Sequence, residues 1–329
     1  MNKSITLTGN SINTNSINGQ GTLNIASGVT LDNSGSIEES IILNVASGSV
    51  LLNKSDITIS SADTISGQIN LNSGTLNLRD NVSIADLNLS AGAGNALIDM
   101  NDSAISTFNI AKVQGQGSDL KIDVDLNTGM SDKLVIAAAP ANTELRLIGI
   151  NVLQDGYADL ITYIAGATNG INSTIHDSNP LNPNPDTSIV MTSGGYTYTF
   201  ELTGKGLLSV SSRFNGTLAE AIANARVMNY SLVNDLNVTT PLGTLATQAG
   251  GRTFNLFGNN HTLSSTSTGI VVANADDIFN SENIKIDGFT NSFVTLNNGT
   301  VTVRERDTME QVRISIDELD AYVGKNLEF

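Results

Sequence analysis

Paired carboxylates are the residues whose type and spacing most readily suggest chemistry. Asp123 and Asp125 stand two positions apart in an alternating segment, and Asp276 and Asp277 are adjacent. Residues two apart on a strand share a face about 6.5–7 Å apart, a separation at which one carboxyl can act as acid and the other as base. Such chemistry usually also recruits Arg, Lys or aromatic groups, and only lysines stand near the first pair. We therefore expect no catalytic residue and no enzyme.

The neighbourhood of the first pair also offers ligands for a cation. Asp123, Asp125 and Asp132 together form a candidate set for Ca²⁺, because hard oxygen ligands suit that ion. The nonapeptide calcium repeat is absent. No other cofactor motif stands out, so Ca²⁺ is the one cofactor that the sequence offers.

The chain has two histidines, His176 and His261. Ser173, His176 and Asp177 resemble a triad on paper, but the members of a triad normally meet by folding and not as near neighbours in the chain. The two histidines also lack the spacing of metal ligands. Both are predicted to be ordinary loop or surface residues.

Composition limits the classes of partner. The 329 residues carry a formal net charge of −16 and no cysteine. This balance argues against a nucleic-acid partner, which needs clustered Lys and Arg, and against attachment to an anionic membrane. No run of 18 apolar residues is present, so we expect no membrane insertion.

A repeated phrase indicates the fold. "LNIASGVTLDNSGSI" begins at Leu23 and "LNVASGSVLLNKSDI" at Leu43, and related segments follow. The equivalent asparagines are numbers 24, 44, 70, 88 and 109, a spacing near twenty that is typical of a solenoid. Short period-two alternation within each unit indicates strands. The predicted fold is all-β, a right-handed parallel β-helix, with an antiparallel sandwich as the competitor.

Changes in composition divide the chain into four parts. Residues 1–150 hold the repeats, and 151–212 form an irregular insertion with the proline-rich loop "DSNPLNPNPDTS". Residues 213–303 are predicted to form a second β-helix segment, with a short capping helix near 217–226 that begins after Thr217. Residues 304–329 are a charged tail in which a helix is predicted from 308 to about 322.

Two phrases resemble known proteins. "IDVDLNTGMSDKLVI" is similar to a strand–turn–strand phrase of autotransporter-type passenger domains, and "AEAIANA", "GGRTFNLFGNNHTLS" and "IKIDGF" follow in the order found in pectate-lyase-like β-helices of bacterial surface proteins. The resemblance implies an extracellular or cell-surface, adhesin-like stalk. The signal peptide and translocator barrel that accompany such passengers are not found in this sequence.

The resemblance and the polar surface together predict the function. We expect a rigid rod that offers a long surface to glycans or host surface proteins, with an oligomeric state that the sequence leaves open. One alternative is a polysaccharide lyase or hydrolase on the same scaffold. Another is a receptor-binding protein like a phage tail fibre.

Overall fold

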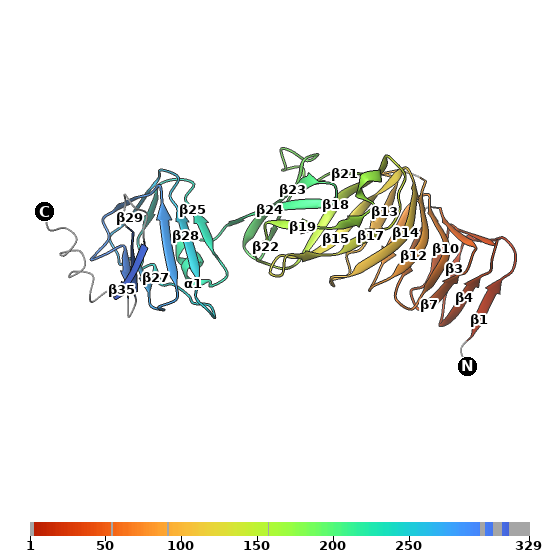
Figure 1. Ribbon diagram of the computed structural model, residues 1–329, viewed down its shortest axis with the longest axis horizontal. Coiled ribbons are helices and arrows are strands. Elements are labelled where there is room, and N and C mark those ends of the chain that lie inside the picture. Colours follow the sequence, from red (N-terminus) through yellow and green to blue (C-terminus); the bar gives the residue numbers. More distant parts are fainter. Residues whose placement is uncertain are drawn as a thin grey trace. The chain divides into compact units, whose positions relative to one another are not determined.

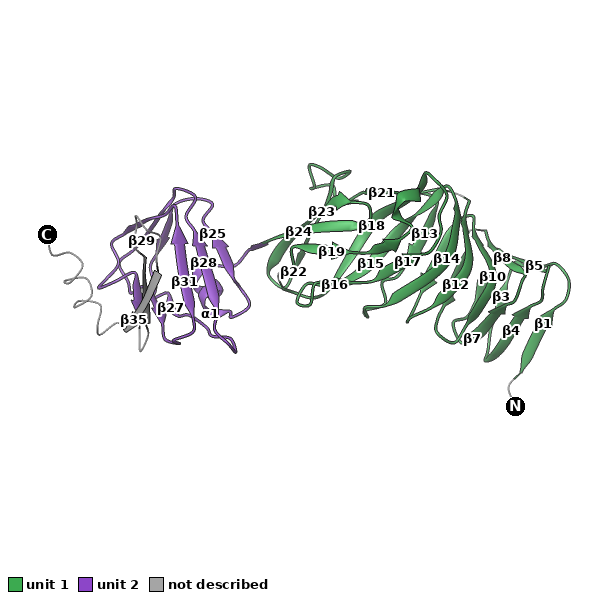
Figure 2. Cartoon of the chain, viewed as in Figure 1, with its two compact units in different colours: residues 1–212 green, residues 213–329 purple. Residues whose placement is uncertain are grey.

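The computed structural model describes residues 3–53, 55–90, 92–156, 158–296, 300–304 and 311–315. The chain divides into two compact units, unit 1 from Met1 to Ser212 and unit 2 from Arg213 to Phe329 (Figure 2). Each unit is described by itself.

Unit 1 is built mainly from two sheets of parallel strands stacked in successive passes of the chain (Figure 1). The 11-stranded sheet contains β1 (Ser4–Leu7), β2 (Ser11–Asn13), β4 (Gly21–Ile25), β5 (Thr30–Asn33), β7 (Ile41–Val45), β8 (Ser49–Leu52), β10 (Thr64–Leu71), β12 (Ser83–Leu89), β14 (Thr107–Gly115), β17 (Lys133–Ile136) and β20 (Ile164–Gly166). The seven-stranded sheet contains β9 (Ser55–Ile59), β11 (Gly74–Leu78), β13 (Ala96–Asp99), β15 (Gly117–Asp125), β16 (Met130–Ser131), β18 (Thr143–Gln154) and β21 (Ile171–Ile175). The short strands β3 (Ser16–Ile17) and β6 (Ser36–Ile37) form a separate pair.

The sequence repeat determines which residues pair between successive passes of the chain. Leu23 pairs with Leu43 and Asn24 pairs with Asn44 in the parallel ladder of β4 and β7. The leucines are buried inside the stack, where apolar burial is the main source of stability. The amide of Asn44 donates to Asn24 Oδ1 at 3.0 Å, on the outward side of the sheet. The repeated asparagines therefore link neighbouring passes.

Glycine marks one of the tightest approaches between passes. Gly117 begins β15 with φ +139°, and a Cβ placed there would lie 1.9 Å from the carbonyl oxygen of Glu144. A side chain at this corner would push β15 away from β18, which pair along nine residues of β15. Only glycine fits this approach.

The parallel stacking ends in the irregular segment. A four-stranded sheet follows, in the order β19 (Leu160–Thr162), β24 (Leu207–Phe214), β23 (Tyr196–Gly204) and β22 (Ser188–Ser193). The strand pairs β22–β23 and β19–β24 are antiparallel. Three prolines precede β22, and proline cannot donate to a ladder, so the chain leaves the parallel stack here.

Unit 2 begins with a short helix and continues in parallel strands. The helix α1 (Leu218–Ala223) has Thr217 as its N-cap, with a capping box to Glu220. Three three-stranded parallel sheets follow: β25 (Asn229–Ser231), β28 (Thr253–Phe257) and β31 (Ile278–Glu282); β26 (Leu236–Val238), β29 (Thr262–Ser265) and β32 (Lys285–Asp287); and β27 (Gly243–Thr244), β30 (Ile270–Val272) and β33 (Val294–Leu296). The 3₁₀-helix η1 (Thr168–Gly170) lies in unit 1.

A buried arginine joins α1 to these strands. Arg252 is 1% exposed, and its guanidinium donates to the carbonyl oxygens of Ala221 and Ile222 near the end of α1. It also donates to the carbonyl oxygens of Val227 and Ala246, and it lies 4.8 Å from the ring centroid of Phe254. A cation at the C-terminal end of a helix also interacts favourably with the helix dipole.

The prediction of a right-handed parallel β-helix fold is wrong. The strands are mostly parallel but fall into several sheets, with few helices. The physical reason is the proline-rich segment and the antiparallel sheet after it, which interrupt the stack. The predicted helix from 308 to about 322 is also wrong where it is described, because residues 311–315 are a strand.

Candidate nucleic-acid interface

The last described strands of the chain form an antiparallel hairpin. β34 (Thr300–Arg304) pairs with β35 (Gln311–Ser315). The register places Thr302 opposite Arg313 and Arg304 opposite Gln311. Of this strand pair, Arg304 and the whole of β35 fall in the predicted tail of residues 304–329, and the ladder brings the two arginine positions near each other.

The sequence of this hairpin alternates along both strands. Polar residues occupy every second position of β34 and β35, and these positions lie opposite one another in the ladder. Valine and isoleucine occupy the remaining positions, which are also paired with each other. The two arginine positions therefore belong to the same alternating set of positions in the ladder.

Charges of both signs are concentrated in this part of the chain, where six Asp and Glu accompany the cations. Residues 293–326 contain four of the 16 Lys and Arg residues, although they make up about a tenth of the sequence. Three of the four are arginines, the side chain whose planar fork matches phosphate oxygens. The arginines are the residues of this segment that suit phosphate contact, although the segment as a whole has a net charge of −2.

Comparison with known proteins identifies the same segment. The family model described as "Anticodon binding domain" matches residues 293–326. Glycine–tRNA ligase from Agathobacter rectalis is 76% identical over 29 residues, which are 9% of this chain and 6% of the relative. The glycine–tRNA ligases of Clostridium tetani and Corynebacterium efficiens are 50% identical over 40 residues and 55% identical over 38 residues, each 12% of this chain and 9% and 8% of the relative. The chain thus spans less than a tenth of the length of these curated relatives.

These matches correct the resemblance drawn from the repeats. They point to an anticodon-binding region of a tRNA ligase and not to an autotransporter passenger or a pectate-lyase-like protein. The expected adhesin-like function, with a glycan or host surface protein as partner, is corrected with it, as are the polysaccharide-degrading and tail-fibre alternatives. The expectation of a non-enzymatic protein is corrected because the relatives are ligases.

The exclusion of nucleic acid is corrected as well. It rested on the net charge of the whole chain, whereas phosphate contact depends on local clusters of cations. A quarter of the cations lie in the matched segment, where acidic residues alternate with them along the chain.

The aspartates predicted as a Ca²⁺ site do not converge. Asp123 and Asp132 are both buried and adjacent, and each carboxylate accepts backbone N–H groups. Asp125 instead accepts the N–H of Asn127 at 2.9 Å in its own turn. Among the described residues, no group of three or more His, Cys, Asp or Glu could hold a metal ion. The Ca²⁺ set stays a prediction.

The buried pair has an unusual titration. Desolvation by burial raises the pKa of Asp132 to about 7, although hydrogen bonds from the N–H groups of Asp123 and Ser106 oppose this shift. The charges of Asp123 and Asp102 act in the same direction as burial. All of these contacts hold the chain between β13 and β16 in place, so the pair acts as a structural clasp.

The residues of the supposed triad separate in the structure. His176 Nδ1 lies 2.6 Å from Asp186 Oδ1, and Ser173 Oγ hydrogen-bonds Tyr163 OH. Asp177 accepts the N–H groups of Asn179 and Val190. These three sets of partners give no relay from an acid through the histidine to the serine hydroxyl.

The other acidic pair is also structural. Asp277 Oδ1 accepts the backbone N–H of Arg252 at 2.7 Å, across two passes of unit 2. Asp276 is exposed, with its own N–H donating to Asn274 Oδ1. His261 Nδ1 lies 3.6 Å from Asp235 Oδ1 at the surface.

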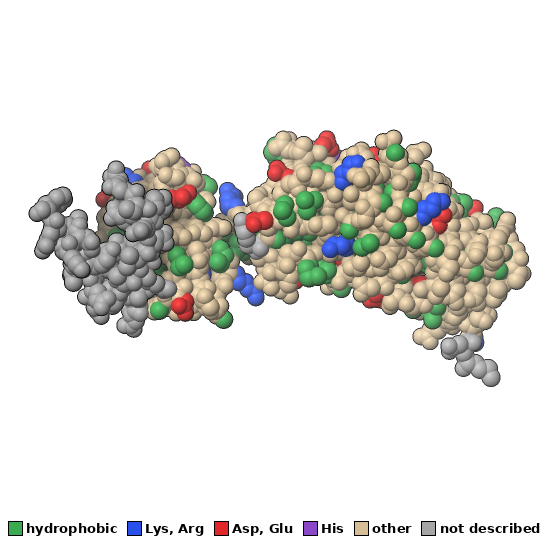
Figure 3. Space-filling model, viewed as in Figure 1, with side chains coloured by type: hydrophobic (Ala, Val, Ile, Leu, Met, Phe, Trp, Pro, Cys, Tyr) green, Lys and Arg blue, Asp and Glu red, His purple; other side chains and the backbone are tan. Residues whose placement is uncertain are grey.

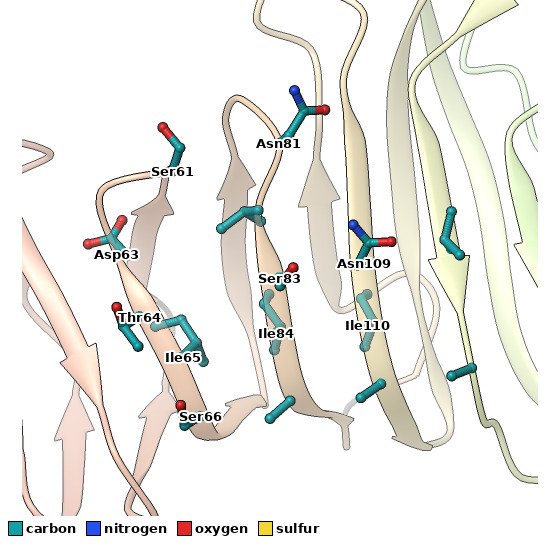
Figure 4. A pocket seen from close by; sticks show the side chains of 15 residues that line it. Ser61, Asp63, Thr64, Ile65, Ser66, Asn81, Ser83, Ile84, Asn109 and Ile110 are labelled. Carbon is teal, nitrogen blue, oxygen red and sulfur yellow. The ribbon is translucent and has the colours of Figure 1, made fainter.

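A shallow groove of about 660 Å³ crosses the 11-stranded sheet of unit 1 (Figure 4). Small and hydroxylated side chains line it, including Ser66, Ser83 and Asn109, over the buried Ile84. Its one carboxylate, Asp63, accepts the backbone N–H groups of Leu43 and Ser60. The residues that line the groove include no second carboxylate, so the acid–base pair that cleavage of a polysaccharide requires is not formed there.

The visible surface is mostly uncharged (Figure 3), as expected of a chain rich in Asn, Ser and Thr. Within the part of the chain that the structure describes, no helix is both long and apolar enough to cross a membrane. The hairpin arginines Arg304 and Arg313 were missed by the sequence reasoning. The signal that could have found them was the rise in charge density after Val303, which was interpreted as a tail.

Proposed function

We propose that residues 293–326 form a tRNA-contacting segment related to the anticodon-binding region of glycine–tRNA ligases. The observation that carries this proposal is the family match over those residues. It is supported by the similarity to several glycine–tRNA ligases, which join glycine to tRNA as their name states. The proposed role is recognition of the tRNA in translation, because the chain shares less than a tenth of those relatives' length.

The hairpin provides a physical basis for such contact. Thr302, Arg304 and Arg313 occupy one set of alternating positions in β34 and β35. Guanidinium groups bind phosphate in a planar, two-point manner, and hydroxyl groups bind phosphate or ribose oxygens.

The remaining charge of the chain sets the conditions of binding. The net charge of −16 repels phosphate at long range, while the arginines attract it at short range. We therefore expect slow, unsteered association at low salt, and affinity that falls as salt rises with a slope of about 0.7–0.9 per phosphate contact.

The test is binding of a fluorescent tRNA(Gly) transcript to the full chain, followed by anisotropy over a salt series. The double variant Arg304→Gln/Arg313→Gln should weaken binding by at least about tenfold, since contacts of charged donors contribute about 1.5–3 kcal/mol each. The salt slope should become shallower by about two contacts.

The matched control is Arg213→Gln/Arg226→Gln. Both residues are exposed in unit 2 outside the matched segment, and the change in net charge is the same. The control should bind tRNA as the unmodified chain does. Equal losses in both double variants would show a general charge effect and would contradict a specific role for the hairpin.

A further inference from the structure

Packing requires glycine at position 216, at the start of unit 2. β24 ends at Phe214, and Thr217 is the N-cap of α1. A Cβ at Gly216 would lie 2.5 Å from Cε1 of the Phe214 ring and 2.9 Å from Glu220 Oε2, closer than such atoms normally approach. The residue before this glycine is Asn215, whose side chain is exposed. The packing therefore keeps a glycine directly after an exposed asparagine.

An Asn–Gly pair can react with itself and then with water. The backbone nitrogen of the glycine attacks Cγ of the asparagine, and the new C–N bond closes a cyclic imide. The side-chain nitrogen takes up the proton of the glycine N–H and leaves as ammonia. Water then adds to one carbonyl carbon of the ring and breaks its C–N bond, which leaves aspartate or isoaspartate. Glycine favours the attack because it has no Cβ to hinder ring closure.

The glycine N–H must leave any hydrogen-bond acceptor before its nitrogen can attack. The described residues contain three Asn–Gly pairs, each with an exposed asparagine: Asn18–Gly19, Asn169–Gly170 and Asn215–Gly216. The N–H of Gly19 donates to Glu38 Oε2 at 3.0 Å, and the N–H of Gly170 donates to the carbonyl oxygen of Ala167 at 3.3 Å. The N–H of Gly216 donates to no described residue. Exposure is thus alike in the three pairs, and the hydrogen bonds distinguish them.

Arg213 favours attack at the third pair. Its Nη2 donates to Asn215 Oδ1 at 3.5 Å. Attack at Cγ moves negative charge onto that oxygen, and a nearby cation stabilises charge that develops in a reaction. Both side chains are exposed, so water screens part of this effect. The described contacts at Asn215 therefore favour the attack, whereas those of the other two glycines oppose it.

We propose that Asn215 is a site of spontaneous deamidation in the folded chain, with water as the co-reactant. The product places a carboxylate beside Arg213, and its isoaspartate form adds a methylene group to the main chain between β24 and α1. The proposal is independent of the proposed tRNA contact, because Asn215 lies outside residues 293–326.

The test is incubation of the full chain at neutral pH, followed by peptide mapping with mass spectrometry. The Asn215 peptide should convert about two- to tenfold faster than the Asn18 and Asn169 peptides, because a glycine hydrogen bond must break at those two sites. In guanidinium chloride the three rates should become similar, since unfolding removes these bonds. Equal rates in the folded chain, or the same order of rates in the unfolded chain, would overturn the proposal.

Two variants supply matched controls. Asn215→Gln should stop conversion at this position, because the longer side chain closes a ring less readily, and it should leave the other two peptides unchanged. Glu38→Ala removes the acceptor of the Gly19 N–H at an exposed position and should raise the rate at Asn18 about two- to tenfold. Circular dichroism establishes that each variant keeps its strands. An unchanged rate at Asn18 in Glu38→Ala would show that these hydrogen bonds do not control the reaction and would contradict the proposal.

Discussion

Asp123 and Asp132 bind each other through both backbone and side chain. The N–H of Asp132 donates to the carbonyl oxygen of Asp123 at 2.9 Å, and the N–H of Asp123 donates to Asp132 Oδ2 at 2.7 Å. Both residues are fully buried. Side chains that suggested a metal or catalytic site thus form a clasp between neighbouring segments of unit 1.

The hydrogen-bonded pair of Asp123 and Asp132 should make the stability of the protein depend on pH. The pKa of Asp132 is raised from 3.8 to about 7 in the folded chain, so folding favours the protonated acid. The contribution of Asp132 to the free energy of unfolding is largest below pH 3.8. It decreases as the pH rises from 3.8 to about 7 and is constant above that. The total decrease is about 4 kcal/mol.

Urea unfolding at several pH values measures this effect. The difference in unfolding free energy between the unmodified chain and Asp132→Asn should shrink between pH 4 and pH 7, since the amide does not titrate there. Parallel stability profiles for the two proteins would show that Asp132 does not take up a proton on folding.

Replacement of Arg252 should greatly reduce the stability of unit 2. Arg252→Met keeps the apolar stem but removes the donors to the carbonyl oxygens of Ala221, Ile222 and Val227. We expect unit 2 to lose about 3–5 kcal/mol. Arg252→Lys should recover little of this, because an ammonium lacks the planar fork.

Urea unfolding followed by circular dichroism checks the loss. Arg226→Met, at an exposed arginine of the same unit, should change stability by no more than about 0.5 kcal/mol. If Arg252→Met were equally mild, the buried guanidinium would not be what holds α1 to the strands.

Replacement of Asn33 should reduce the stability of unit 1 by a smaller amount. This asparagine is fully buried, and its amide donates to the carbonyl oxygen of Gly35 and to Ser55 Oγ while accepting from Asn13. Asn33→Ala should cost about 1–3 kcal/mol, because it leaves buried polar partners unpaired. The control is Asn101→Ala at an exposed position, which should leave the stability nearly unchanged. Similar losses in both variants would show that the hydrogen bonds of Asn33 do not stabilise unit 1.

Part of the architecture could be predicted from the spacing of asparagines. Asn24 pairs with Asn44 and Asn70 pairs with Asn88, as a repeat near twenty residues requires. Asn109 does not continue the series, because it pairs with Ser83 and Asn88 pairs with Gln114. Drift in the repeat length hides such shifts, since one inserted residue moves every later position to the other face.

The antiparallel sheet and the C-terminal hairpin could not be predicted in the same way. In the antiparallel sheet, the pairing of β19 with β24 joins residues that are distant in sequence. In the tail a helix was predicted from 308 to about 322, but residues 311–315 alternate valine and isoleucine with polar residues and form a strand. Period two over five residues was the better signal.

The candidate site was missed because charge was averaged over the chain. The net charge of −16 excluded nucleic acid in that reasoning, although recognition of phosphate needs only a few well-placed cations. The acidic pairs attracted attention instead, and Asp123, Asp132 and Asp277 proved to bind backbone N–H groups.

The central claim is that residues 293–326 contact the anticodon region of a tRNA. The most direct measurement compares the binding of tRNA(Gly) with that of the same transcript carrying a replaced anticodon, at one fixed salt concentration. The account predicts weaker binding of the replaced anticodon by about tenfold or more, because unpaired bases are read directly. Arg304→Gln/Arg313→Gln should weaken the binding of both transcripts by a similar factor, because phosphate contacts carry no sequence information. Equal binding of both transcripts by the unmodified chain, or binding of both that the double variant leaves unchanged, would contradict it.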